Sequence, residues 1–418
     1  MLRSLFKSSL SLFILKGINM ISPIILIPLL TSKYAPSEVG KLFFYQALAV
    51  FLAMIIEYGF NLNGTKKVAQ EFNEIEKCKH LTSILIAKIY LIIPSVVFLL
   101  SISLFVTEEL YNSTFLTLAL FSGVAQGFTP AWYYHGRNET NKALFYDGSA
   151  AILYLILTLI FVLLGFEVFS VILSQIISRV ICYIFSYNKL LDSKLLRKYL
   201  RVSYSVAKKE IIEGFSFFFF RLTSSLYTKT STFFLGMSES ASVIASYSGA
   251  EKVSKGTCGL LSPISQALFP RLSYLLKHDI KQGKSLFISA GSTLIALSSI
   301  TSISLFYFSE TIINFLLGSG YEEAYFILKV LSLLPVVITV SNLFGVQLLL
   351  NLGLQKYFNR VIVICSLLHI VFITFSIHFY GVIGLAVQIV IIETLVAISM
   401  FLVSLFKTKF WCEQLNEK

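Results

Sequence analysis

Charged residues are scarce along this sequence. Asp, Glu, Lys and Arg make up only 13% of its 418 residues, whereas a soluble domain carries about 25%. Apolar residues make up 56%, and the shortage of charge runs along the whole chain, so no soluble domain can be separated from the rest. We therefore expect an all-α polytopic membrane protein, for which the lipid bilayer is the main solvent.

The motifs of enzymes and metal sites are also missing. The five cysteines show no CxxC spacing and the five histidines no HxxxH or HExxH spacing, so we expect neither a disulfide nor a metal site. No GxGxxG, Walker or GxSxG motif occurs, which predicts no cofactor, no use of ATP and no enzymatic activity. The net charge of +12 resides largely in short loops, where it indicates topology rather than binding of a nucleic acid.

Twelve apolar runs approach or exceed the roughly 20 residues that a helix needs to cross about 30 Å of hydrocarbon. The predicted spans are Leu10–Leu30, Val39–Tyr58, Leu81–Val106, Phe115–Tyr134, Ala143–Leu164, Phe166–Ser186, Ile212–Leu235, Ser242–Phe269, Leu286–Phe308, Ala324–Leu350, Val361–Tyr380 and Val382–Phe406. The first run is longer than the core of a cleaved signal, about 7–15 residues, so we expect it to be retained. Proline kinks are expected at Pro94, Pro130, Pro263 and Pro335.

Basic residues gather in alternate loops. One set of loops holds most of the Lys and Arg, including seven in the central loop, whereas the opposite set holds Lys33, Lys41 and little else. Cytoplasmic loops are the ones enriched in Lys and Arg. The alternation therefore predicts that both termini are cytoplasmic.

The polar segment between residues 188 and 210 divides the chain into two predicted halves, 1–205 and 206–418, of six spans each. In each half the first two spans are joined by a short outer turn and followed by a basic amphipathic stretch. Two similar six-helix bundles are typical of transporters that bind their substrate between the halves, near the middle of the membrane.

Several basic residues fall inside the predicted spans, where ionisable groups usually face a cavity or a partner. Counting inward at 1.5 Å per residue places Arg179, Arg221 and Lys252 near the middle of the membrane, with Lys255 slightly deeper. Ser224 and Thr228 share one helix face with Arg221. We interpret this set as a cationic cavity wall suited to a phosphate group. The alternatives are internal pairing, as between Glu251 and Lys255, and hydroxyls that only join helices.

Three further residues are candidates for ion coupling or gating. Glu393 and His369 lie at matching depths in the last two spans, so they could form a proton- or cation-responsive pair. A structural hydrogen bond is the simpler interpretation of that pair. Glu57 ends the second span, where a capping role competes with a gating role.

Several segments resemble the Wzx-type flippases of polysaccharide repeat units, in the multidrug/oligosaccharidyl-lipid/polysaccharide (MOP) exporter superfamily. The matching segments are PLLTS at 28–32, VGKLFFY at 39–45, EYGFNLNGTKKVA at 57–69, PAWYYHGRNE at 130–139, YSGAEK at 247–252, LLSPISQALFPR at 260–271 and LFGVQLLL at 343–350. The resemblance covers nearly the whole chain and is most specific in SPISQALFPR. One departure is Lys66, where such proteins often have Arg; the substitution keeps the charge but loses the bidentate fork of a guanidinium group.

The resemblance implies a MATE/MOP-like fold in a bacterial inner membrane. The implied substrate is an undecaprenyl-pyrophosphate-linked oligosaccharide, such as an O-antigen repeat unit, that passes from the cytoplasmic to the periplasmic leaflet. H+ or Na+ is the candidate coupling ion, and a polysaccharide polymerase or other assembly proteins are candidate partners. A cation-coupled multidrug exporter on the same fold is the alternative function. A membrane glycosyltransferase or polymerase is disfavoured because no outer loop is long enough for a catalytic domain.

Overall fold

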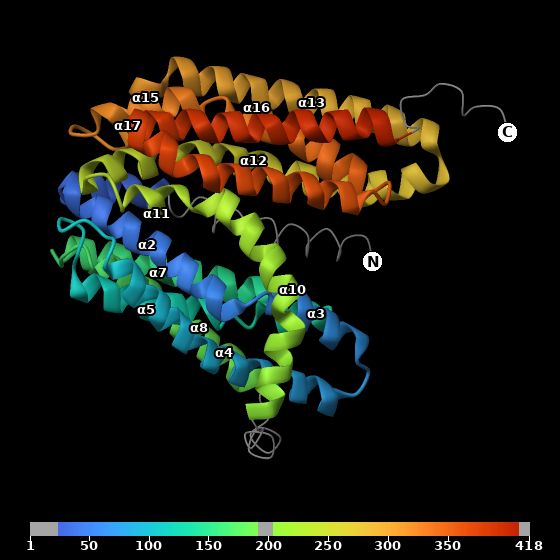
Figure 1. The fold of residues 1–418 in the computed structure, drawn as a ribbon, viewed down its shortest axis with the longest axis horizontal. Coiled ribbons are helices and arrows are strands. Elements are labelled where there is room, and N and C mark those ends of the chain that lie inside the picture. Colours follow the sequence, from blue (N-terminus) through green and yellow to red (C-terminus); the bar gives the residue numbers. More distant parts are fainter. Residues whose placement is uncertain (1–23, 191–203, 409–418) are drawn as a thin grey trace. The chain divides into compact units, whose positions relative to one another are not determined.

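The computed structural model describes residues 24–190 and 204–408, and within these two stretches every regular element is a helix (Figure 1). This confirms the predicted all-α class for the described residues. Seven of the described helices are long and apolar enough to cross a membrane, judged by length and composition. The chain is therefore a multi-pass membrane protein, whereas the count of twelve spans stays a prediction.

The chain folds into two compact units. Unit 1 comprises the residues up to Leu222 together with Gly236–Ala245, and unit 2 comprises Thr223–Leu235 and the residues from Ser246 on. The first group of helices is Ile24–Lys33, α2 (Pro36–Glu57), α3 (Phe60–Gln70), α4 (Glu74–Ser103), α5 (Ser113–Gly127), α6 (Ala131–Gly136), α7 (Thr140–Leu163) and α8 (Ser170–Leu190). Two helices, α10 (Tyr204–Lys229) and α12 (Ala241–His278), contribute residues to both units. The remaining helices are α11 (Ser231–Leu235), α13 (Ile280–Tyr307), α14 (Ser309–Leu316), α15 (Glu322–Leu331), α16 (Leu334–Asn342), the π-helix η1 (Leu343–Leu350) and α17 (Gln355–Lys407).

From the second onward, each predicted span overlaps one helix or a succession of helices. The first, Leu10–Leu30, lies largely outside the described residues. The last two spans are the two arms of α17, which turns at Gly381 (φ 59°, ψ −152°). The predicted halves 1–205 and 206–418 stay a prediction, since compact units and repeated spans are different properties of a chain.

Three predicted spans are not single helices. The fourth divides into α5 and α6 around Pro130, the seventh into α10 and α11 around Thr230, and the tenth into α15, α16 and η1. Pro130 precedes α6 and Pro335 lies in the first turn of α16, positions where a missing N–H costs nothing. By contrast, α4 and α12 continue through Pro94 and Pro263.

Helix α2 forms the centre of unit 1. Thirteen of its 22 residues are buried, and it packs most closely against α5 through Gly123 and Gly127. A Cβ atom at either glycine would lie 2.6 Å from a side-chain carbon of α2, belonging to Leu52 and Ile56 respectively. Small residues four apart let two membrane helices approach closely, and this contact fixes α5 beside the end of α2.

Candidate functional site

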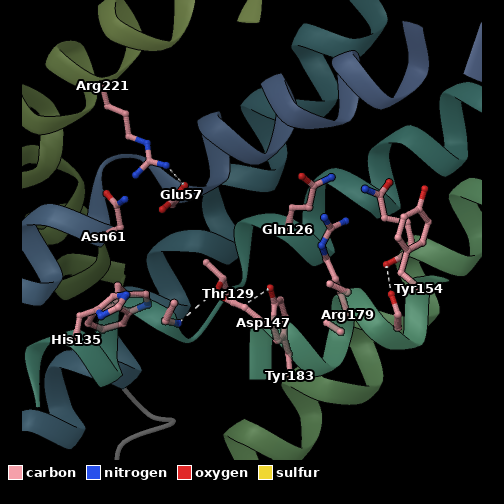
Figure 2. A pocket seen from close by; sticks show the side chains of 16 residues that line it. Glu57, Asn61, Gln126, Thr129, His135, Asp147, Tyr154, Arg179, Tyr183 and Arg221 are labelled. Carbon is pink, nitrogen blue, oxygen red and sulfur yellow. Dashed lines mark hydrogen bonds and ion pairs between the residues drawn. The ribbon is translucent and has the colours of Figure 1, made fainter. Parts of the chain in front are cut away.

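A polar cavity of about 460 Å³ lies within unit 1, where α2, α3, α5, α6, α7, α8 and α10 meet (Figure 2). Its lining residues are Glu57, Asn61, Gln126, Thr129, Ala131, Trp132, His135, Asp147, Ala150, Ala151, Tyr154, Gln175, Ser178, Arg179, Tyr183 and Arg221. Two arginines and two carboxylates lie among them. With His135 neutral, their formal charges cancel.

One side of the cavity holds the ion pair of Arg221 and Glu57 (Figure 2). The Nη2 atom of Arg221 lies 2.8 Å from Oε2 of Glu57. Helix α2 ends at Glu57, and the next residue, Tyr58, has a left-handed backbone and stacks on Phe218 of α10, with 4.5 Å between the ring centroids. Gly59 follows with φ +74°, and a Cβ there would lie 2.8 Å from the α10 backbone. A glycine is therefore needed where the end of α2 meets α10.

The other side of the cavity holds Arg179, Gln175, Asp147 and Tyr183. With the Gln175 amide oriented so that its oxygen faces Arg179, that oxygen lies 3.0 and 3.2 Å from the two terminal guanidinium nitrogens. The Tyr183 hydroxyl donates a hydrogen bond to Oδ1 of Asp147 over 3.0 Å, and Asp147 attracts Arg179 electrostatically. In contrast to Arg221, Arg179 forms no ion pair within 4.0 Å among the described residues.

A buried lysine lies behind the cavity wall, at the break between α5 and α6. The side chain of Lys88, on α4, is fully buried, and its Nζ donates to the carbonyl oxygen of Gly127 over 2.8 Å. The Tyr187 hydroxyl donates to the next carbonyl, that of Phe128, also over 2.8 Å. A helix that ends inside a membrane needs such donors for its last carbonyls, and a cation is also favoured at a helix C-terminus.

The break matters because it shapes the cavity. Gln126 and Thr129 flank the last carbonyls of α5, and Trp132 lies in the first turn of α6, so all three reach the cavity from this one feature. Lys88 also lies 5.9 Å from the ring centroids of Phe128 and Trp132. It is thus a positioning residue for this wall.

The other basic candidates belong to unit 2. Lys255 is 43% exposed and pairs with Glu251 at 2.8 Å, which is the internal pairing considered from the sequence. Glu251 also accepts a hydrogen bond from Tyr247. Lys252 is half-buried on the same helix, α12. The side chains of Ser224 and Thr228 lie outside the described residues.

The predicted coupling residues His369 and Glu393 also belong to unit 2. His369 is buried, and its Nε2 lies 3.2 Å from the hydroxyl of Thr230. Glu393, on the second arm of α17, is half-buried and acts electrostatically on the thiols of Cys258 and Cys365. The pairing of His369 with Glu393 stays a prediction.

Sequence reasoning missed several residues of this site. Asp147 and Lys88 are ionisable groups inside predicted spans, so the same rule that found Arg179 could have found them. Gln126, Gln175, Tyr154 and Tyr183 carry no such signal, because uncharged polar residues are common in membrane helices. Only the packing of α5 and α7 against α8 places them around one cavity.

Comparison with known proteins identifies the family. A family described as "Polysaccharide biosynthesis protein" matches residues 5–276, well over half of the chain. A "Putative O-antigen transporter" of Escherichia coli (strain K12) is 25% identical over 402 residues, covering 96% of each chain. A protein of Shigella dysenteriae with the same description is 24% identical, covering 94% of this chain and 98% of its own.

Solved structures agree on the fold. Lipid II flippase MurJ in an inward closed conformation matches with a TM-score of 0.70 and 16% identity, covering 96% of this chain and 88% of its own. An inward-facing MATE family multidrug transporter of the MOP superfamily matches with a TM-score of 0.64 and 14% identity, covering 94% of both. These proteins are named as transporters and flippases, in agreement with the prediction that the chain is not an enzyme. The chain belongs to the polysaccharide biosynthesis protein family and has the fold of the MOP superfamily, as its sequence resemblance predicted.

Proposed function

We propose that the chain is a flippase for an undecaprenyl-pyrophosphate-linked oligosaccharide, such as an O-antigen repeat unit. It moves this lipid from the cytoplasmic to the periplasmic leaflet of a bacterial inner membrane by alternating access. Twelve spans in two six-helix halves, 1–205 and 206–418, carry the movement, with both termini in the cytoplasm. The polar cavity is the observation that supports the proposal best, because it places two guanidinium groups among apolar helices. The O-antigen transporter names of the relatives support the substrate class.

The two arginines have different roles in this proposal. Arg179 contacts the amide of Gln175, and the carboxylate of Asp147 attracts it without forming an ion pair. Its guanidinium group can therefore bind a phosphate without breaking an ion pair. Arg221 must exchange Glu57 for the phosphate. Protonation of Glu57, or a coupling cation bound beside it, favours that exchange, which links the pyrophosphate to an H+ or Na+ gradient. Lys252, Lys255, Ser224 and Thr228 remain candidates for contacts from unit 2, and His369 and Glu393 for coupling there.

The test is complementation of a strain that lacks this gene and displays no surface polysaccharide. Arg179→Ala and Arg221→Ala should insert normally and reduce display at least about tenfold, because a hydrogen bond to a charged group contributes about 1.5–3 kcal/mol and 1.4 kcal/mol corresponds to a factor of ten. Arg360→Ala is the matched control, since Arg360 is exposed near the start of α17. Normal display by both cavity variants would rule out the arginine-lined passage.

The alternative function is a cation-coupled multidrug exporter. Two observations favour it: the MATE transporter among the structural neighbours and the two carboxylates in the polar cavity, which suit cationic drugs. The same strains discriminate between the functions. A flippase restores polysaccharide display and leaves susceptibility to cationic dyes and drugs unchanged, whereas an exporter lowers that susceptibility without restoring display.

A further inference from the structure

Two apolar clefts lie in unit 2, on either side of the second arm of α17. The first cleft, of about 480 Å³, lies against α13 and α15, and the second, of about 690 Å³, lies between the two arms of α17. Ile383, Val387 and Ile391 border both clefts. Spaced four residues apart, they form a ridge along one helix face.

The clefts open toward the hydrocarbon of the bilayer. All three ridge residues are more than 40% exposed, as are Phe326 in the first cleft and Phe375 in the second. Large apolar side chains on such a face are covered by lipid chains in a membrane protein. Both volumes lie in the usual range of ligand pockets, about 300–1,000 Å³.

One cation interrupts the first cleft. Lys329 on α15 is exposed, and its Nζ lies 4.7 Å from the ring centroid of Phe306. It forms no ion pair with any carboxylate of the described residues. It lies seven residues beyond the start of α15, a depth of about 10 Å at 1.5 Å per residue. A lysine facing hydrocarbon is costly unless its ammonium group reaches the interface or meets an anion.

We propose that the two clefts hold the two acyl chains of an anionic glycerophospholipid, whose phosphate pairs with Lys329. The ridge divides the site into two clefts, which suits a lipid with two chains better than a polyprenyl lipid with one. The ends of three elements mark the headgroup side: α13 ends at Tyr307, α15 begins at Glu322, and α17 turns at Gly381. This site does not depend on the proposed substrate, since it lies in unit 2 and faces the bilayer.

The test measures lipid binding to the purified full-length protein by native mass spectrometry. The probes are dioleoylphosphatidylglycerol and dioleoylphosphatidylcholine, which share their chains and differ in net charge. The wild type should bind the anionic lipid about tenfold more tightly, about 1.4 kcal/mol. Lys329→Gln should bind both lipids equally, and Lys329→Arg should keep the preference. Lys33→Gln, at an exposed lysine of unit 1, is the matched control and should behave as the wild type.

A second variant tests the chain sites. Val387→Trp places a larger side chain in the clefts that border the ridge. It should weaken binding of both phospholipids while the protein keeps its thermal unfolding midpoint. An unchanged preference in Lys329→Gln, or unchanged binding in Val387→Trp, overturns the assignment. Displacement of phosphatidylglycerol by undecaprenyl phosphate at equal concentration overturns it as well, because the occupant is then a polyprenyl lipid with one chain.

Discussion

Lys88, Arg179 and Arg221 are three cations among apolar helices, and each has a different environment. Lys88 meets a backbone carbonyl, Arg221 a carboxylate, and Arg179 an amide. Burial of a cation costs free energy unless a partner offsets the loss of water. The partner indicates the role: Lys88 is held in place, whereas Arg221 has a partner that another anion can replace.

At this scale we predict that Lys88→Met destabilises unit 1. The substitution leaves the carbonyl of Gly127 buried without its donor, which costs about 1–3 kcal/mol. The thermal unfolding midpoint of the purified protein should fall by several degrees. Lys356→Met is the control, because Lys356 is exposed at the start of α17, and it should leave the midpoint unchanged. Equal midpoints for the two variants would show that Lys88 is not needed at the break.

The candidate site was predictable in part. Arg179 and Arg221 stand out as charges inside apolar runs, and both line the polar cavity. The carboxylate partner of Arg221 was harder to see, because Glu57 and Arg221 are 164 residues apart and only the contact of α2 with α10 joins them. The other candidate residues belong to unit 2, whereas the two arginines belong to unit 1. This division depends on long-range packing, which no local pattern encodes.

Helix α10 forms ion pairs with the other helices of unit 1 near its N-terminus as well as at Arg221. Nζ of Lys67 on α3 lies 2.6 Å from Glu210 and 2.6 Å from Glu213, and His80 on α4 lies 3.8 Å from Glu210. Ser83 also donates to Glu210 over 3.3 Å. This cluster explains why α10 belongs to unit 1 as far as Leu222, although the whole span was predicted to lie in the second half.

The cluster predicts how stability depends on pH. Burial opposes ionisation of Glu210, but the nearby His80 ring and the hydrogen bond from Lys67 outweigh it, so the pKa of this carboxyl lies below its ordinary value. A lowered acid pKa contributes stability above the ordinary pKa of about 4.3, and that stability is lost as the pH falls through the lowered value. Glu210→Gln should therefore lower the thermal midpoint at pH 7 and differ less from the wild type below about pH 4.

The control for this prediction is Glu76→Gln, at a carboxylate that is 41% exposed and paired with Lys79. Exposed pairs contribute about 0–1 kcal/mol, so its midpoint should follow the wild type at every pH. A deficit of Glu210→Gln that stayed constant down to pH 3 would show that the loss comes from packing rather than from charge.

The helices themselves were largely predictable from the sequence, because length and hydropathy decide which segments cross a membrane. The breaks within predicted spans were not predictable in this way. Pro130 and Pro335 marked two of them, but Pro94 and Pro263 lie in continuous helices. Whether a proline ends a helix depends on donors such as Lys88 and Tyr187, which are supplied by neighbouring helices.

At the scale of the whole molecule, the two least apolar predicted spans decide the topology. Helices α10 and α12 carry several charges and are not among the seven helices that qualify by length and composition. If α10 crosses the membrane, Ser242 lies on the same side as Glu167. If α12 crosses, Lys281 lies on the side opposite to Ser242. A helix that does not cross reverses its own relation and leaves the other unchanged.

Cysteine labelling tests these relations. In a variant with the five native cysteines replaced by serine, single cysteines are placed at five exposed positions: Lys142, Glu167, Ser242, Lys281 and Glu310. A membrane-impermeant maleimide should label positions 167, 242 and 310 in intact spheroplasts, and positions 142 and 281 only after permeabilisation, because the loops rich in Lys and Arg remain inside. Lys142 lies in the first turn of α7 and Glu167 beyond its end, and Lys281 and Glu310 are placed in the same way on α13, so each half carries its own control. Labelling of positions 242 and 281 from the same side would remove α12 as a span and, with it, the count of twelve.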